Sequence, residues 1–194
     1  MTQDFASPEF QALIRSGDSD ALRAVVDAYL GQVHRAARGA GLTAQEADDV
    51  TQETFATFLE GAPRFEGRSH VRTWLLGILY NKIREARRHL SRARNLEDID
   101  QIVESRFKAD GSWSKAPRRA DASLHDREIH GHISDCLDDL PTAQRAAFAF
   151  REVEGLSMSE ICKILGVTST NLGVMLYRAR NRLRECLEAK GVWG

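Results

Sequence analysis

The chain has 194 residues, of which 42% are hydrophobic and 28% are charged. This composition is ordinary for a globular protein and suffices for one domain or two small ones. The formal net charge of −1 argues against a diffuse polycation, although a basic stripe on such a chain still allows directed nucleic-acid binding. No apolar run approaches the roughly 18 residues of a membrane span. Residues 1–10 lack the features of a secretory signal, so we expect a cytoplasmic protein.

Residues 8–40 have the apolar spacing of one or two helices. Residues 16–18, Ser-Gly-Asp, interrupt that spacing, and Gly39 and Gly41 end it. No segment of the chain alternates with period two for long enough to predict a strand, so the expected fold is all-α. The apolar residues expected to face the core are Phe10, Leu13, Ile14, Leu22, Val25, Val26, Tyr29, Leu30 and Val33.

Residues 43–60 carry Asp and Glu but no Lys or Arg. Thr43 followed by Glu46 forms a capping box, which predicts a helix start, and Gly61 and Pro63 predict its end. The apolar side should consist of Ala47, Val50, Phe55, Phe58 and Leu59. The residues left facing outward are Asp48, Asp49, Gln52 and Glu53.

Residues 64–94 are rich in Arg. Ser69 is the expected N-cap of a helix there. Its core face should carry Leu75, Leu79, Ile83, Ala86 and Leu90. Its opposite face should carry Gly77, Asn81, Arg84 and Arg88, with Tyr80 and Arg87 at the edge. Such a face is either a solvated basic surface or a site for a polyanion; two adjacent helices of opposite charge favour two different partners.

Helical spacing fails over residues 95–123, which are rich in small and polar residues and predict a linker. The aromatic residues Phe107 and Trp113 fall in it, and the sequence does not decide whether they pack locally or dock on a partner.

Residues 124–194 return to helical spacing. Apolar residues repeat up to Pro141, and a second helix follows and ends at Glu154 and Gly155. Ser157 with Glu160 is another capping box, Gly166 makes a turn, and a last helix begins near Thr168. A short helix, a Gly turn and a longer helix are typical of a helix-turn-helix, against the alternative of a plain helical hairpin. The last helix should bury Leu172, Leu176, Ala179, Leu183 and Leu187 and carry a cationic tail of Arg178, Arg180, Arg182 and Arg184.

Three cysteines, Cys136, Cys162 and Cys186, lie far apart in the sequence. Their odd number and wide spacing argue against a disulfide framework. Cys136 and Cys162 fall in apolar helical patterns, where a free cysteine packs as a small core residue. The nearest approach to a zinc site is His130, His132 and Cys136, whose spacing matches no recognised finger. We therefore expect neither a metal nor a cofactor.

No phosphate-binding loop, nucleophile elbow or HExxH motif occurs in the chain. The adjacent carboxylates Asp48 and Asp49 lie on an exposed helical face, where general acid–base catalysis is not expected. The sequence therefore predicts no catalytic residues, no small-molecule substrate and no enzyme.

Three motifs, in this order, resemble conserved regions 2 and 4 of the bacterial sigma-70 family, in its extracytoplasmic-function (ECF) group. They are EADDVTQETF, RTWLLGILYNKIREARR and LPTAQRAAFAFREVEGLSMSEICKILGVTSTNLGVMLYRARNRLR. The resemblance implies a region 2-like domain over residues 8–94, a flexible linker over 95–123 and a region 4-like helix-turn-helix domain over 124–194. It also implies three partners: RNA polymerase core, promoter DNA and an anti-sigma factor.

The resemblance assigns roles to residues of this chain. Core polymerase would bind Asp48, Asp49, Gln52, Glu53 and Phe55. The minus 10 element and melted DNA would contact Arg64, Arg68, Arg72, Trp74, Asn81, Arg84, Arg87 and Arg88. The minus 35 element would contact Ser169, Thr170, Asn171, Val174, Tyr177, Arg178 and Asn181.

One part of the last helix departs from the family pattern. Many relatives carry Lys, Ser and Arg where this chain has Gly173, Val174 and Met175. The departure shifts expected DNA contacts toward Asn171, Tyr177 and Arg178. Two alternatives are a sigma-like decoy that binds only an anti-sigma factor and an operator-binding repressor. A decoy has no need of Asn81, Arg84, Arg87, Arg88 and the cationic tail, and a repressor leaves the acidic helix unexplained.

Overall fold

The structure is a computed structural model that describes residues 4–91 and 126–192. All regular secondary structure in these two ranges is helical, which agrees with the expected fold class. The first range, called here the first unit, contains α1 (Pro8–Ser16), α2 (Ser19–Gly39), α3 (Ala44–Gly61), the 3-10 turn η1 (Ala62–Arg64) and α4 (Val71–Ser91). The second unit contains α5 (Asp126–Asp138), α6 (Thr142–Phe148), the π-helical turn η3 (Ala149–Val153), α7 (Met158–Leu165) and α8 (Ser169–Ala189).

The helix starts follow the predicted capping residues, with one exception. Thr43 and Ser157 both form complete capping boxes with the Glu three residues later. The N-cap expected at Ser69 is wrong, because α4 begins only at Val71. There the His70 Nδ1 accepts a hydrogen bond from the backbone N–H of Arg72 at 3.1 Å. The cap is therefore supplied by the imidazole of His70, one residue after the serine whose hydroxyl was expected to supply it.

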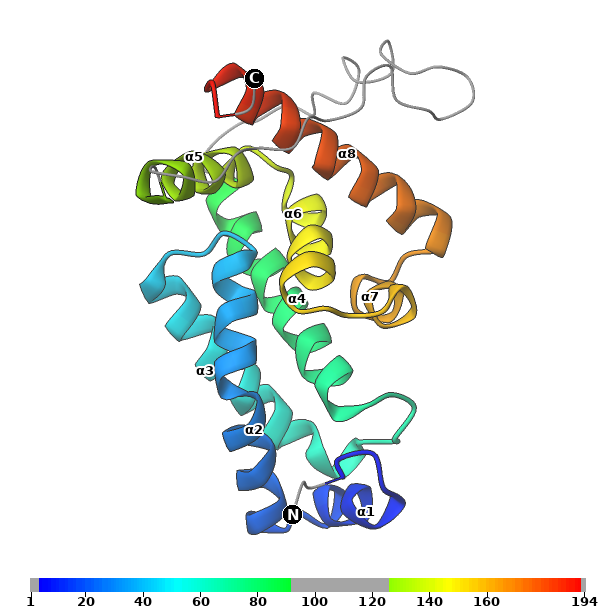
Figure 1. The fold of residues 1–194 in the computed structure, drawn as a ribbon. Helices are drawn as coiled ribbons and strands as arrows, with labels where there is room; N and C mark the ends of the chain where they lie inside the picture. The colour runs from blue at the N-terminus through cyan, green and yellow to red at the C-terminus, as the bar shows by residue number, and fades with distance from the viewer. Residues whose placement is uncertain (1–3, 92–125, 193–194) are drawn as a thin grey trace.

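In the first unit, α2, α3 and α4 lie side by side and α1 closes one end (Figure 1). The large side chains of Phe58, Leu75, Leu79 and Ile83 are fully buried among these helices. Three residues assigned to the apolar sides are instead exposed: Leu13, Leu30 and Leu59. Each lies at the margin of its stripe, where helix-helix packing ends, so period alone placed them wrongly.

The second unit packs against the first. Helix α7 contacts α4 (Figure 1), and η3 contacts α2. The apolar core is continuous across this contact, since Phe150, Ile161 and Leu172 belong to the same cluster as Phe58 and Leu75. The division of the chain at residues 94 and 124 stays a prediction, and the predicted linker with Phe107 and Trp113 lies outside the described residues.

The expectation of free thiols is wrong for two of the cysteines. Cys136 of α5 and Cys186 of α8 form a disulfide across 50 residues of sequence, while Cys162 is free. A small second cluster surrounds the bond, with Leu140, Ala179 and Leu183 buried in it. Since the Cys136 sulfur is bonded to sulfur, it is not available as a zinc ligand in this form of the protein.

Candidate protein and nucleic-acid interfaces

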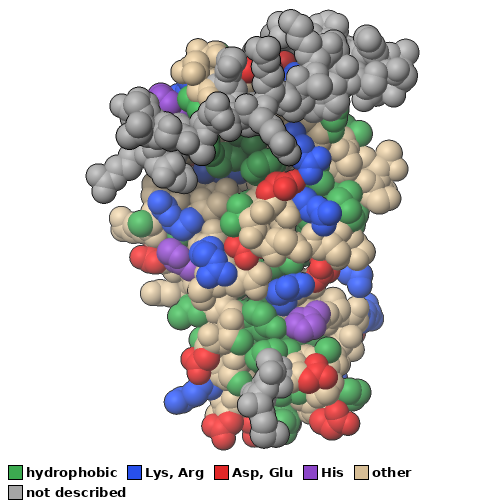
Figure 2. Space-filling view, viewed as in Figure 1, with side chains coloured by type: hydrophobic (Ala, Val, Ile, Leu, Met, Phe, Trp, Pro, Cys, Tyr) green, Lys and Arg blue, Asp and Glu red, His purple; other side chains and the backbone are tan. Residues whose placement is uncertain are grey.

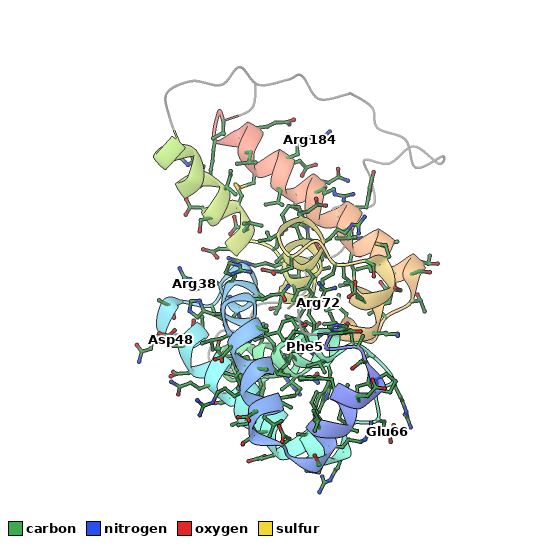
Figure 3. All side chains as sticks on the ribbon, turned by 60° about the horizontal axis from the view of Figure 1, so that its bottom comes forward. Phe5, Arg38, Asp48, Glu66, Arg72 and Arg184 are labelled. Carbon is green, nitrogen blue, oxygen red and sulfur yellow. A yellow bond between two sulfur atoms is a disulfide. The ribbon has the colours of Figure 1, made fainter. Side chains whose placement is uncertain are left out.

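The outward side of α3 is an acidic face, defined here as Asp48, Asp49, Gln52 and Glu53. All four side chains are exposed, and Asp48 projects from the edge of the molecule (Figure 3). Two of them have partners at the borders of the face: Asp48 lies 3.1 Å from the His34 Nε2, and Glu53 lies 3.2 Å from the Lys82 Nζ. These pairs fix the edges of the face and leave Asp49 and Gln52 at its centre.

Phe55, the fifth residue assigned to core binding, lies on the other side of α3. Its side chain is only 7% exposed and belongs to the core. The buried Thr54 Oγ1 next to it donates to the carbonyl of Val50 at 2.7 Å. The structure therefore does not bring Phe55 onto the acidic face, and in this arrangement it can affect a partner only through the position of α3.

Between α3 and α4 the chain forms a shallow hollow of about 380 Å³. Arg64 and Arg68 stand at its rim and are exposed. Trp74 forms one wall, where its ring stacks on Phe65 with ring centres 4.8 Å apart. Arg68 is paired with Glu66. Aromatic and cationic groups together suit an unstacked base or a phosphate of single-stranded DNA.

The outer face of α4, defined here as Asn81, Arg84 and Arg88, is exposed as the spacing predicted. The Arg84 guanidinium lies over the ring of Tyr80, 5.8 Å from its centre. The Arg88 Nε donates to the carbonyl of Arg84 at 3.3 Å. The three side chains therefore line one strip along the helix, the arrangement needed to follow a nucleic-acid backbone or groove.

Two residues assigned to the minus 10 set are held elsewhere. Arg72 and Arg87 are half-buried. The Arg72 Nη2 lies 2.5 Å from the Glu160 Oε1 of α7, near the middle of the molecule (Figure 3). The Arg87 Nη2 donates to the carbonyl of Gly41 at 2.5 Å. In this arrangement neither guanidinium belongs to the outer face of α4.

On the second unit, the start of α8 is open to solvent. Thr168 caps the helix by accepting the N–H of Asn171 at 3.3 Å. Gly166 provides the preceding turn in the left-handed conformation, with φ of 68°, as the helix-turn-helix pattern predicted. The exposed residues of the first two turns are Ser169, Thr170, Asn171, Gly173 and Val174.

The later minus 35 residues are less open. Tyr177, Arg178 and Asn181 are half-buried, and the Oδ1 of Asn181 is fully buried. The cationic tail is also engaged within the unit, since Arg180 pairs with Glu152 at 2.6 Å. Of the residues assigned to the minus 35 element, only those in the first two turns of α8 are therefore exposed in this structure.

The contact between the two units contains residues that sequence reasoning did not connect. Glu154 bridges to α2, where its Oε2 accepts from the Gln32 Nε2 at 2.9 Å. The buried Arg145 donates to the carbonyl of Gly39 at 3.0 Å and pairs with Asp138. The signal in the sequence was Arg145 itself, a single cation beside the alanines of α6. A cation within a segment that packs into a core requires polar partners there.

The electrostatics of Glu160 reflect this contact. Partial burial opposes ionisation of Glu160, but hydrogen bonds from Ser157 and the Arg72 guanidinium outweigh it and lower its pKa to about 2. Burial, followed by the charge of Arg72, lowers the pKa of His70 against the opposing effect of Glu160 and Asp4. At neutral pH, Glu160 is thus charged and His70 is neutral, the forms that make the contacts described above.

A groove of about 410 Å³ separates part of α4 from α7. Asn81 and Gly77 line it from the first unit, and Lys163 and Ile164 line it from the second. Figure 2 shows several acidic side chains at the end of the molecule near α1 and Lys and Arg side chains higher on the same face. Because Asn81 lines this groove, the groove borders the outer face of α4 at the place where the two candidate DNA-contacting units meet.

Comparison with known proteins identifies both units. Residues 25–95 match the family model for sigma-70 region 2, and residues 131–183 match that for sigma-70 region 4. A protein of Haemophilus influenzae described as a probable RNA polymerase sigma factor is 32% identical over 152 residues, covering 74% of this chain and 78% of that protein. The chain belongs to the sigma-70 family, in its ECF group.

Other similar proteins also match over most of the length of this sigma factor. The ECF RNA polymerase sigma factor SigC of Mycobacterium tuberculosis is 28% identical over 176 residues, covering 89% of this chain and 80% of SigC. The fold is similar to that of the sigma factor RpoE of Bartonella quintana, solved in complex with the anti-sigma factor NepR. That match has a TM-score of 0.63 and 22% identity and covers 86% of this chain and 96% of RpoE. In the part of the chain that the structure describes, no helix is long and apolar enough to cross a membrane.

Proposed function

We propose that this sigma factor recruits RNA polymerase core to promoters through three surfaces, without catalysing a reaction itself. The acidic face of α3 binds core polymerase. The outer face of α4, with the hollow between α3 and α4, contacts the minus 10 element and its melted strand. The first two turns of α8 read the minus 35 element. The observation that carries the proposal is that three separate exposed faces, one acidic and two with DNA-reading chemistry, stand on a framework whose apolar sides are buried.

The acidic face suits a protein partner better than DNA. Its carboxylates would repel phosphates, whereas complementary charge steers docking and penalises wrong partners. Each exposed charge contributes little alone, so the face acts as a set. Within the described residues, no other side chain is arranged around Asp49 and Gln52, at the centre of the face, as a catalytic partner.

The outer face of α4 offers two kinds of DNA contact. Arg84 and Arg88 can pair with phosphates or with base edges, and the amide of Asn81 offers a donor and an acceptor to one base. Phosphate contacts give affinity on any sequence, while base contacts choose the sequence. We therefore assign positioning to Arg88 and promoter choice to Asn81.

Transcription in vitro with purified core polymerase and a promoter library tests these assignments together. Asp49→Lys should weaken core binding severalfold, whereas Asp27→Lys, the same charge change at an exposed position of α2, should not. Arg88→Ala should weaken every promoter and reduce the salt slope by about one unit. Asn81→Ala should change which promoters are used.

The outcomes separate the alternatives. A decoy would fail to support transcription while binding an anti-sigma factor, and a repressor would bind DNA without core polymerase. Unchanged core affinity in Asp49→Lys would remove the acidic face from the proposal. Unchanged promoter opening in the Asn81→Ala, Arg88→Ala double variant, seen by permanganate footprinting, would remove the outer face of α4.

An anti-sigma factor is proposed as a further partner. RpoE of Bartonella quintana was solved with NepR, and this chain shares its fold. A pull-down with purified candidate anti-sigma factors tests the proposal, and competition with core polymerase would show whether the two partners share a surface.

A further inference from the structure

Val174 occupies the most outward position of the first two turns of α8. The buried stripe of this helix is Leu172, Leu176, Ala179 and Leu183. At 3.6 residues per turn, Val174 lies about 180° from the middle of that stripe. Its side chain is 42% exposed. It therefore stands at the centre of the surface that a groove-docked α8 would turn toward base edges.

The fold gives no reason for a valine at this position. Val174 makes no contribution to either apolar cluster. A β-branched residue also has a lower helix propensity than the straight-chain polar residues that suit an exposed position. Its exposed neighbours Thr170 and Asn171 are polar. An exposed valine among polar residues is explained if it contacts an apolar group on a binding partner, and if that group is itself surrounded by polar groups.

Gly173 adds a second, independent observation. An added Cβ at Gly173 would meet no atom within 4 Å, so no neighbouring helix requires a glycine there. Within the described residues, close packing of another helix therefore does not account for Gly173. Glycine at such a site costs helix stability relative to alanine. Its effect is to remove side-chain bulk beside Val174, which allows the helix backbone to come closer to a surface in front of it.

We infer that Val174 reads a thymine in the minus 35 element through the C5 methyl group, with Gly173 allowing α8 to seat deeply enough for that contact. This inference rests on the proposed minus 35 role of α8. In the major groove only thymine presents a methyl group. Valine has no donor or acceptor with which to read the polar edge of any base. The ligand chemistry selected by Val174 is therefore the thymine methyl group alone.

The size of the effect follows from the burial of one methyl group. Removing such a group from water changes an equilibrium by about fourfold. This is large enough to bias one position of a promoter, yet smaller than the loss expected when a base-specific hydrogen-bonding residue is removed. Val174 should thus sharpen a preference that polar residues of the same turns establish.

The test uses the complete sigma factor bound to core polymerase. A selection from randomised minus 35 sequences first identifies the preferred site. Each thymine of that site is then replaced, one at a time, by deoxyuridine, which lacks the methyl group but keeps the same hydrogen-bonding edge. For the wild type, one replacement should weaken promoter binding about fourfold. Val174→Ala should bind the thymine promoter as weakly as the wild type binds the deoxyuridine promoter, with no further loss on replacement.

Three controls accompany the test. Val153→Ala removes another exposed valine, in η3, and should keep the full sensitivity to deoxyuridine. Asn171→Ala should weaken binding but keep that sensitivity. Gly173→Ala should weaken binding to the thymine promoter more than to the deoxyuridine promoter, because α8 would no longer seat deeply enough for Val174 to reach the methyl group. Circular dichroism should show unchanged helix content in all of them, since none of these side chains is buried.

The results distinguish the inference from the function on which it rests. A selected site without thymine, or an equal loss on deoxyuridine replacement in wild type and Val174→Ala, overturns the role of Val174 while leaving minus 35 reading by α8 intact. A selection that returns no minus 35 preference, with Asn171→Ala indistinguishable from wild type, overturns the minus 35 role itself.

Discussion

The two units of this sigma factor are held together in different ways. In the first unit, three long helices bury large side chains against one another, among them Phe58, Leu75 and Ile83. In the second, the central helix α6 and the turn η3 bury three small residues, Ala146, Ala147 and Ala149, beside one large one, Phe150. Stabilisation by burial grows with the apolar area removed from water, so alanines contribute less than these larger residues.

The second unit has two further sources of stability, which are apolar contacts with the first unit and a disulfide. Its core is divided: Phe150, Ile161 and Leu172 complete the cluster of the first unit, while the Cys136–Cys186 bond anchors a smaller cluster of its own. The first unit thus shares its core with the second, whereas the second unit also has a small cluster of its own that the disulfide joins. This difference matters for function because α8, the proposed minus 35 reader, carries one end of that bond.

The largest expected effect comes from breaking the disulfide. Helix α5 has its main contacts with α8, so the bond is a principal restraint on it. Its loss should lower the free energy of unfolding of the second unit by about 2–4 kcal/mol. Hydrogen exchange should show faster exchange of amides in α5 and α8 after reduction, with little change in α2 and α3.

Two variants control for side effects of the reductant. Cys136→Ser with Cys186→Ser should reproduce the change without any reductant. Cys162→Ser removes the free thiol and should exchange like the wild type both before and after reduction. Equal acceleration in the two units on reduction would contradict the contrast between them.

Local sequence patterns were enough to predict the helices and most of their buried sides. Capping boxes at Thr43 and Ser157 and the left-handed turn at Gly166 appear as expected, because each depends only on residues a few positions apart. The acidic face of α3 and the outer face of α4 were likewise predicted from helical period. Phe55 follows the period into the core, so its assignment to core binding from family resemblance conflicts with its position in the helix.

The links between distant residues could not be predicted in the same way. Cys136 and Cys186 are separated by 50 residues, and Arg72 and Glu160 by 88. Whether such pairs meet depends on which helix faces come together, which no local pattern encodes. Helical period alone placed Arg87 at the edge of a DNA-facing surface. Its partner, the carbonyl of Gly41, is far from it in the sequence and meets it only in the folded chain.

A smaller effect is expected from the Arg72–Glu160 pair, which joins the units. The two side chains are 34% and 24% exposed, so solvent screening limits the loss in Arg72→Ala to about 1 kcal/mol. The pKa of Glu160, about 2 in the intact protein, should rise in this variant but stay below its usual value, because Ser157 still donates to it. Titration followed by NMR measures the change directly.

The sign of the accompanying pH effect follows from that lowered pKa. Ionised Glu160 stabilises the folded protein fully above its ordinary pKa of 4.5, and this contribution is lost as pH falls toward about 2. Arg72→Ala should therefore lose less stability on acidification than the wild type. Arg68→Ala is the matched control, since Arg68 pairs with Glu66 inside the first unit. If both variants leave the titration of Glu160 unchanged, the contact between α4 and α7 does not persist in solution.

The smallest expected effect comes from His70, the capping residue of α4 beside the contact. Its neutral Nδ1 accepts the N–H of Arg72 at 3.1 Å, and protonation would abolish this acceptor. Burial and the charge of Arg72 lower the pKa of His70 below its usual 6.5, while Glu160 and Asp4 oppose the shift; the Tyr29 ring lies across from it, 6.3 Å between centres. The folded state thus binds the proton less tightly than the unfolded state. Stability from this residue is complete above pH 6.5 and decreases as pH falls through the lowered pKa.

His70→Asn separates the cap from its titration. The Asn side-chain oxygen can accept the same N–H but does not titrate in this range. Near pH 8 the variant should match the wild type to within about 1 kcal/mol, the usual range for a cap. As pH falls below 6.5 the wild type should lose stability relative to His70→Asn, because only the imidazole titrates there. Denaturant unfolding of both proteins across this range measures the difference. Parallel stability curves would mean that the imidazole does not cap α4 in solution, and the start of the proposed minus 10 helix would then be held by packing on the first unit alone.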